Sequence, residues 1–310
     1  MVTIVPLMTP WRRAAFILLP IILFLSGCGR GGKPEAVWLE TGVAPGEVVY
    51  PRGIAYSASD DTFYVVDHTA RIQHFDHDGR PLGEWRTPSM LVESPEGLVV
   101  DPDGNLWAAD SHLSRIIEYS HTGKLLRIFG SYGFGPGQFV LPTAVQFDSR
   151  GRMFVSEYGD HDRIQVFDKK LHFLFQFGSF GRGDGQFIRP EAMAIDGDTL
   201  YVADACNHRI DVFTTDGKWL RNIGHCGSGL GEFRFPYGIA LDNEGHLIVS
   251  EFGNSRVQLV DMKTGKGLKI WGTPGYAPGE LAYPWGVICD KHDRVIVVDS
   301  GNNRLQVFRF

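Results

Sequence analysis

The residues best suited to chemistry follow six prolines that recur every 44 to 48 positions along the 310-residue chain. These prolines are Pro51, Pro95, Pro142, Pro190, Pro236 and Pro284. A position that serves only the fold should repeat its residue type, but the residues that follow the prolines differ: Arg52, Glu96, Thr143, Glu191, Tyr237 and Trp285. Carboxylates, an arginine and aromatic rings gathered in one place could bind a small polar ligand or a peptide.

A second variable set follows an acidic residue that also occurs once per interval. These acidic residues are Asp67, Asp110, Glu157, Asp204, Glu251 and Asp299. After them come His68, Ser111 with His112, Tyr158, Ala205, Phe252 and Ser300. We expect both sets to lie near the mouth of one channel, with the ligand-binding residues Arg52, His68, Glu96, His112, Tyr158, Glu191, Tyr237 and Trp285. The alternative is that they are solvated loop residues without a ligand.

The segments that must position these residues each predict four short β-strands and a glycine-rich loop. Segments such as 163–167, 209–213 and 304–308 alternate apolar and polar residues, as half-buried antiparallel strands do. Many of the 38 glycines lie in the loops, where tight turns need a positive φ. Four strands in each repeat of about 45 residues are typical of a propeller blade. The sequence therefore predicts an all-β, six-bladed β-propeller.

The two ends of the chain predict how the ring closes. The sixth repeat stops at Phe310, after its third strand. Segment 38–51 shares Pro-Gly-Glu and Tyr-Pro with segment 270–284, which begins as the fourth strand of blade five. We therefore expect residues 37–42 to form the outer strand of blade six, which would leave the ring without a free edge. The propeller domain would span residues 37–310.

An arginine follows each recurring acidic residue after four to six positions: Arg71, Arg115, Arg163, Arg209, Arg256 and Arg304. A residue type that repeats once per blade at one position usually serves the blade. We expect each acid–arginine pair to tie the second strand to the third by a charge-assisted hydrogen bond, and not to form a charged binding ring.

The repeats resemble the NHL repeat in their Pro-x-Gly/Ala start, their Asp-ended second strand, their Asn-x-Arg segments and their glycine-rich loops. The segments that match this part of the repeat best are 207–210, 254–257 and 303–305. The resemblance covers residues 37–310 and implies a six-bladed propeller, but it does not decide the activity because one fold hosts many functions. Blade one departs most, since residues 85–90 replace the glycine-rich loop.

Related enzymes provide the alternative function, a metal-dependent envelope lyase or hydrolase. In the amidating lyase with similar repeats, histidines after three blade-opening prolines hold zinc, and this chain has none there. Sugar lactonases hold calcium or zinc in the channel, for which Glu96 and Glu191 are the remaining candidates. We favour a binding or scaffolding module whose partner is a protein, a peptide or a small polar ligand on the face of the glycine-rich loops.

The first 36 residues predict export and a lipid anchor. Arg12 and Arg13 precede an apolar run, residues 14–25, that is too short to span a bilayer. The run ends in Leu-Ser-Gly-Cys28, which resembles the lipobox of bacterial lipoproteins. We expect residues 1–27 to be the signal peptide, Cys28 the lipidated residue, 28–36 a flexible tether, and the periplasmic face of the outer membrane the location. An ordinary signal peptide with an incidental cysteine is the alternative.

Charge argues against a nucleic-acid partner. Removal of residues 1–27 takes away two of the 30 basic side chains and none of the 36 acidic ones, so the remaining charge is 28 − 36 = −8. Such an acidic domain would repel a phosphate backbone.

Two cysteines lie in loops on the same expected face. Cys206 follows the second strand of blade four, and Cys226 lies in the loop after the fourth strand of that blade. In an oxidising periplasm they could form a disulfide. Two free thiols, or a metal site with His208 and His225, are the alternatives.

Overall fold

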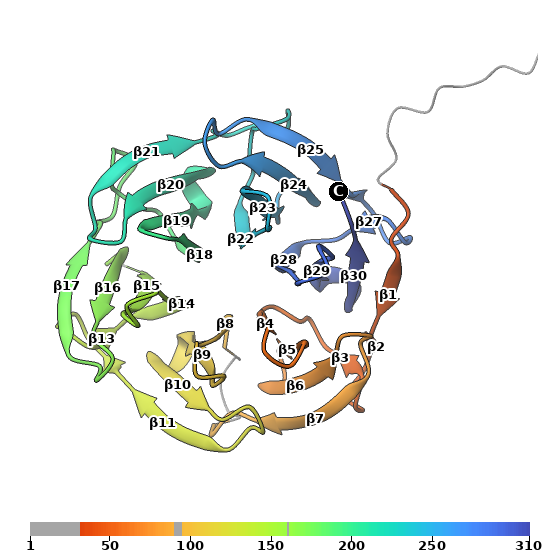
Figure 1. Cartoon of the computed structure of the whole chain (residues 1–310), viewed down its shortest axis with the longest axis horizontal. Coiled ribbons are helices and arrows are strands. Elements are labelled where there is room, and N and C mark those ends of the chain that lie inside the picture. Colours follow the sequence, from red (N-terminus) through yellow and green to blue (C-terminus); the bar gives the residue numbers. More distant parts are fainter. Residues whose placement is uncertain (1–31, 90–94, 160) are drawn as a thin grey trace, which may run out of the picture.

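The computed structural model describes residues 32–89, 95–159 and 161–310. Six four-stranded antiparallel sheets stand around a central axis and confirm the six-bladed propeller (Figure 1). The expected signal peptide, the expected lipidation site Cys28 and the first part of the expected tether lie outside the described residues. No helix of the described part is both long enough and apolar enough to cross a membrane.

Blades one to three follow one another along the chain, each running from an inner to an outer strand. Blade one contains β4 (Ile54–Ser57), β5 (Thr62–Val66), β6 (Arg71–Asp76) and β7 (Pro81–Arg86). Blade two contains β8 (Gly97–Val100), β9 (Leu106–Asp110), β10 (Arg115–Tyr119) and β11 (Leu125–Phe129). Blade three contains β14 (Leu141–Phe147), β15 (Met153–Tyr158), β16 (Arg163–Phe167) and β17 (Phe173–Phe177).

Blades four to six complete the ring. Blade four contains β18 (Pro190–Asp196), β19 (Thr199–Asp204), β20 (Arg209–Thr214) and β21 (Trp219–Ile223). Blade five contains β22 (Pro236–Leu241), β23 (His246–Glu251), β24 (Arg256–Asp261) and β25 (Gly267–Trp271). Blade six contains β28 (Pro284–Cys289), β29 (Val295–Asp299), β30 (Arg304–Phe308) and, from the other end of the chain, β1 (Ala36–Trp38).

The glycine-rich loops, which we call the Gly loops, join the outer strand of one blade to the inner strand of the next. Several contain short parallel pairs: β2 (Glu40–Thr41) with β3 (Glu47–Val48), β12 (Ser131–Tyr132) with β13 (Gln138–Phe139), and β26 (Thr273–Pro274) with β27 (Glu280–Leu281). Five of the Gly loops each bury one apolar side chain completely: Val48, Phe139, Phe187, Phe233 and Leu281. Glycine is needed beside this plug, since a Cβ on Gly178 (φ +86°) would lie 2.3 Å from the Phe187 ring.

The ring closes as expected, although the closing strand is shorter than residues 37–42. β1 pairs antiparallel with β30, and Val37 lies opposite Gln306. Pairing ends at Trp38 because Leu39 has a positive φ of 67°, after which β2 turns to pair with β3. Trp38 stacks on Phe63 of blade one with ring centroids 5.5 Å apart, so the strand joins two blades.

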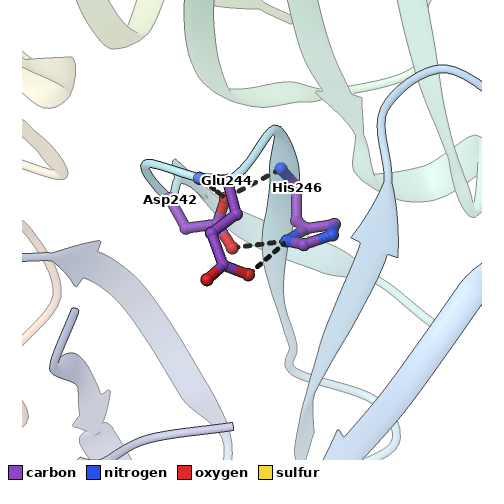
Figure 2. A group of neighbouring side chains, drawn as sticks. All are labelled: Asp242, Glu244 and His246. Atoms are coloured by element: carbon purple, nitrogen blue, oxygen red, sulfur yellow. Dashed lines mark hydrogen bonds and ion pairs between the residues drawn. The ribbon is translucent and has the colours of Figure 1, made fainter.

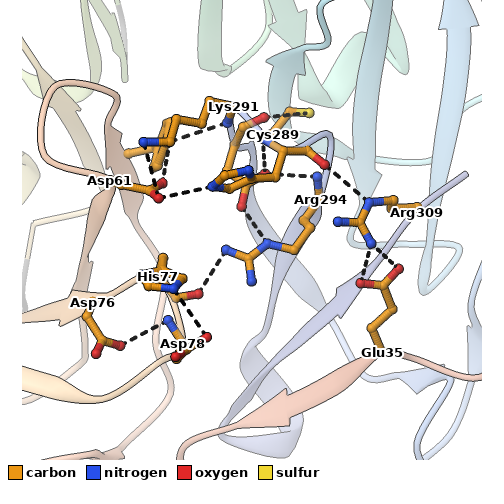
Figure 3. A network of polar contacts seen from close by, with 12 residues as sticks. Glu35, Asp61, Asp76, His77, Asp78, Cys289, Lys291, Arg294 and Arg309 are labelled. Atoms are coloured by element: carbon orange, nitrogen blue, oxygen red, sulfur yellow. Dashed lines mark hydrogen bonds and ion pairs between the residues drawn. The ribbon is translucent and has the colours of Figure 1, made fainter.

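Polar contacts reinforce the closure of the ring, both within blade six and between blades six and one (Figure 3). Arg309 contacts both carboxylate oxygens of Glu35, each at 2.6 Å, directly before β1. Asp61 of blade one contacts Lys291 Nζ at 3.2 Å and His292 Nε2 at 3.0 Å from blade six. Arg294 donates to the carbonyl oxygen of His77 between the same two blades. These contacts join residues that are more than 200 positions apart in the sequence.

Candidate functional site

The repeated acid–arginine pairs belong to the blade framework, as expected. The pairs and their shortest distances are Arg71–Asp67 3.0 Å, Arg115–Asp110 2.8 Å, Arg163–Glu157 2.7 Å, Arg209–Asp204 3.2 Å, Arg256–Glu251 2.5 Å and Arg304–Asp299 2.7 Å. Five of the arginines also donate to Gly-loop carbonyls; Arg256, for example, reaches Gly229 O and Glu232 O at 2.8 Å. The pairs thus hold the Gly loops in place.

The inner strands surround a cavity of about 310 Å³ on the axis of the ring. The residues after the six blade-opening prolines all line it: Arg52, Glu96, Thr143, Glu191, Tyr237 and Trp285. Because these residues directly follow the Gly loops, they lie at the end of the cavity on that side, which we call the channel mouth. The face of the ring that carries the Gly loops and the channel mouth is the Gly-loop face.

One half of the channel mouth is built on Arg52 and Glu96. Arg52 Nη1 donates to Glu96 Oε1 at 2.9 Å, and its guanidinium lies over the Trp285 ring, 4.8 Å from the centroid. The Glu96 side chain is only 4% exposed. Its other oxygen, Oε2, is buried and has no hydrogen-bond partner within the described residues.

The other half is built on Arg189, which sequence reasoning missed. Arg189 Nε pairs with the Glu191 carboxylate, and its guanidinium lies 4.8 Å from the Tyr158 centroid and 5.2 Å from that of Tyr237. Arg189 has a left-handed backbone (φ +64°), held in part by its N–H donating to Asp162 at 2.8 Å. The sequence offered one signal for Arg189, namely its position directly before a blade-opening proline. Tyr50, Phe235 and Tyr283 occupy the same position in other blades and share the left-handed backbone conformation.

Burial dominates the electrostatics of the channel mouth. It raises the pKa of Glu191, and the nearby Glu96 charge raises it further, while Arg189 opposes the shift. Burial, followed by the Glu96 charge, also raises the pKa of Tyr158 to about 12. The channel mouth therefore contains two carboxylates, each of which makes ionisation of the other less favourable, and two arginines whose positive charges offset theirs.

His68, His112 and Tyr158 are not among the residues that line the cavity, so their part in ligand binding stays a prediction. Both histidine side chains are exposed. His112 lies in the short 3₁₀-helix η1 (Ser111–Leu113), in which the buried Ser111 donates to Pro142 O, so the histidine is on the solvent side. His68 packs edge-on against Tyr50, 6.4 Å between ring centroids.

The carboxylates at the channel mouth do not form a convincing metal site, because Glu96 and Glu191 are each paired with an arginine. Within the described residues, a ligand-like group forms elsewhere, from Asp242, Glu244 and His246 (Figure 2). Asp242 Oδ1 accepts from the N–H groups of Glu244 and His246. The same turn recurs at Asp101, Asp148 and Asp290. The group of Asp242, Glu244 and His246 therefore belongs to a hairpin turn that several blades share.

The expected disulfide is not formed, because Cys206 and Cys226 are free thiols in the structure. The Cys226 loop packs against blade five, where Arg256 Nη1 reaches Ser228 O at 2.5 Å. Cys206 stays over blade four in η2 (Ala205–Asn207), with its N–H donating to Ile188 O at 3.0 Å. Sequence reasoning placed both loops on one face correctly but overlooked this offset of one blade.

Comparison with protein families matches three separate parts of the chain. Residues 39–132 match the SMP-30/gluconolactonase/LRE-like region, residues 195–258 match a family described as a 6-bladed β-propeller, and residues 281–308 match the NHL repeat. The chain is a six-bladed β-propeller, and a segment in its sixth blade matches the NHL repeat. Three parts of the propeller thus resemble three different families.

Curated relatives match only parts of this propeller. NHL repeat-containing protein 3 of Homo sapiens is 35% identical over 83 residues, which are 26% of this chain and 24% of that protein. The B-box type zinc finger protein ncl-1 of Caenorhabditis elegans is 40% identical over 137 residues, 43% of this chain and 15% of that protein. The chain therefore matches about a quarter or less of the length of these relatives.

Solved structures share the fold at low identity. A streptogramin B lyase has a TM-score of 0.63 and 16% identity, covering 88% of this chain and 96% of that one. A chain of a nidogen/laminin complex has a TM-score of 0.59 and 19% identity, covering 77% and 84%. These neighbours include an enzyme and a protein–protein complex, so the fold alone does not select between the two functions.

Proposed function

We propose that this protein is an exported, lipid-anchored propeller that binds a protein, a peptide or a small polar ligand at the channel mouth on its Gly-loop face. The single observation that carries the proposal is Glu96, whose buried Oε2 lacks a partner within the described residues although it lines a cavity. Leaving a buried acceptor unsatisfied costs about 1–3 kcal/mol, and a ligand donor would remove that cost.

Exposed aromatic side chains in the Gly loops support a macromolecular partner on the same face. Tyr132, Phe180 and Tyr276 occupy three different Gly loops and are 68%, 63% and 81% exposed. Aromatic residues are enriched at the centres of protein interfaces. The similarity to NHL-repeat proteins agrees with a binding module of this kind.

The enzymatic alternative receives less support from the channel mouth. One similar structure is a Staphylococcus aureus virginiamycin B lyase described as catalytically inactive when its histidine is replaced by alanine. In the described part of this chain, no histidine lines the cavity. We therefore place binding before lyase or hydrolase activity.

Site-specific photo-crosslinking in intact cells tests the proposal. A photoreactive residue at Tyr276 or Tyr132 should give adducts of defined mass, since both side chains are on the Gly-loop face. The matched control is the exposed Lys170, in the β16–β17 turn on the opposite face. Equal adducts from Lys170, or none from the two tyrosines, would contradict the proposed face.

The lipid anchor has its own test. Cys28→Ser should abolish fatty-acid labelling and release the propeller from the membrane fraction, because the thiol is the proposed acylation site. Cys289→Ser is the control, since that half-buried thiol is in β28 of the propeller. Unchanged labelling of the Cys28→Ser protein would show that the lipobox interpretation is wrong.

A further inference from the structure

The channel mouth contains an acceptor and a donor group that other described residues leave unused. The acceptor is Glu96 Oε2, which is buried while Oε1 accepts from Arg52. The donor is the outer part of Arg189, since Nε contacts Glu191 and no acceptor within the described residues is found for Nη1 or Nη2. A ligand that fits this site should satisfy both groups.

Glu96 is suited to an ammonium group. A carboxylate in a site this enclosed is stabilised by strong donors, and an ammonium group provides up to three of them. Arg52 already neutralises one oxygen at 2.9 Å, so the buried charge is tolerated without the ligand while the second oxygen remains available.

Arg189 is suited to a carboxylate. A guanidinium has five N–H donors in a planar fork that matches the two oxygens of a carboxylate. The Tyr158 and Tyr237 rings hold this guanidinium 4.8 and 5.2 Å from their centroids, which fixes its orientation. Its side chain is 26% exposed, so a ligand can reach it from solvent.

The two groups belong to one cavity. Glu96 lines the cavity directly, and Arg189 contacts Glu191 and Tyr237, which both line it. Two arginines and two glutamates give no net charge when all are ionised, so the site favours a ligand with separated opposite charges. The volume of about 310 Å³ is at the small end for ligand cavities.

We propose that the channel mouth binds a free α-amino acid, with its ammonium group on Glu96, its carboxylate on Arg189 and its side chain against Trp285 and Tyr237. This inference rests on the proposed binding function and adds the class of ligand to it. It does not depend on which macromolecule, if any, contacts the loop tips.

Calorimetric titration of the full-length protein with L-leucine, L-serine and L-phenylalanine tests the inference. At least one of them should bind with a dissociation constant of about 1 mM or tighter. N-acetylation should remove the contact with Glu96, and amidation should remove the contact with Arg189. Each derivative should therefore bind at least about tenfold more weakly than its parent, the ratio expected for a loss of about 1.4 kcal/mol.

Variants assign each end of the ligand. Glu96→Gln should make the parent and its N-acetyl derivative bind equally, and Arg189→Gln should do the same for the parent and its amide. The controls are Glu40→Gln and Arg182→Gln, exposed residues of two Gly loops for which no ion pair is found within the described residues. They should retain both preferences.

The inference is wrong if no amino acid binds the unaltered protein, or if the acetylated and amidated derivatives bind as well as their parents. These ligand comparisons need no variant and remain decisive if a variant fails to fold. If they fail while crosslinking from Tyr276 and Tyr132 persists, the ligand class is wrong but the binding function stands. Failure of both overturns both.

Discussion

Deletion of residues 36–38 is expected to abolish the cooperative unfolding of the propeller. The deletion removes the fourth strand of blade six and exposes the edge of β30. It also removes Trp38, which is half-buried and packs on Phe63 of blade one, so part of the about 3–5 kcal/mol that a fully buried tryptophan contributes is lost as well. Since total stability of a domain is typically only about 5–15 kcal/mol, the ring should open.

Calorimetry and light scattering on heating measure this effect. The variant should give a broad transition at much lower temperature and aggregate through its free edge. Deletion of Gly32 and Lys33, which are exposed and precede β1, provides the control and should melt like the parent. A single, sharp transition at the parental temperature in the 36–38 variant would contradict ring closure by β1.

A second large effect is expected from pH, through an irregularity in blade four. At the third residue of the third strand, blades one, three, five and six carry Gln73, Gln165, Gln258 and Gln306, but blade four carries Asp211. Asp211 and Asp204 are both fully buried and share Arg209 Nε, at 3.0 and 3.2 Å. Burial raises the pKa of both carboxyls, and the Asp211 charge adds to the shift of Asp204.

The sign of the pH dependence follows from that shift. A carboxyl whose native pKa is raised binds its proton more tightly in the folded state, so the stability that this pair contributes is fully present below the ordinary aspartate pKa of about 3.9. The stability from this pair should decline as pH rises from there through the raised native pKa. Asp211→Gln restores the residue of the other blades and should remove the decline, with a gain of about 1–3 kcal/mol at pH 8.

Denaturant unfolding at pH 5 and pH 8 gives the comparison. The variant should gain stability over the parent at pH 8 and gain much less at pH 5. Gln258→Asn in blade five controls for a change of side chain at the same position and should lower stability equally at both pH values. An equal effect of Asp211→Gln at both pH values would show that both carboxyls are ionised throughout the range.

The architecture was predictable because its causes repeat. Each blade needs the same acid–arginine pair, and five Gly loops need a buried apolar side chain at the same position, so the period appears in the sequence. Ring closure was predictable because residues 38–51 share the sequence of a Gly loop. The exact end of β1 was not, since it depends on the left-handed conformation of Leu39.

The channel mouth was predictable only in part. The residues after the prolines line the cavity because every inner strand begins there in the same orientation. The positions after the recurring acids are less uniform: Tyr158 packs on Arg189, whereas His112 continues into a 3₁₀-helix and faces solvent. The place of Arg189 at the channel mouth depends on its backbone conformation, and the position of Cys226 depends on the packing of its loop against the next blade. Residue type alone predicts neither of them.

The most direct test distinguishes residues of the binding site from residues of the blade framework. It compares a double variant, Glu96→Gln with Glu191→Gln, with the single variant Arg256→Ala. Calorimetric binding of an amino acid that the unaltered protein binds, and thermal stability, would be determined for both. We expect the glutamine variant to lose binding and melt close to the parent. Arg256→Ala should keep binding but lose about 1–3 kcal/mol, because Glu251 loses its charged partner. The opposite pattern would contradict the assignment of the channel mouth as the binding site.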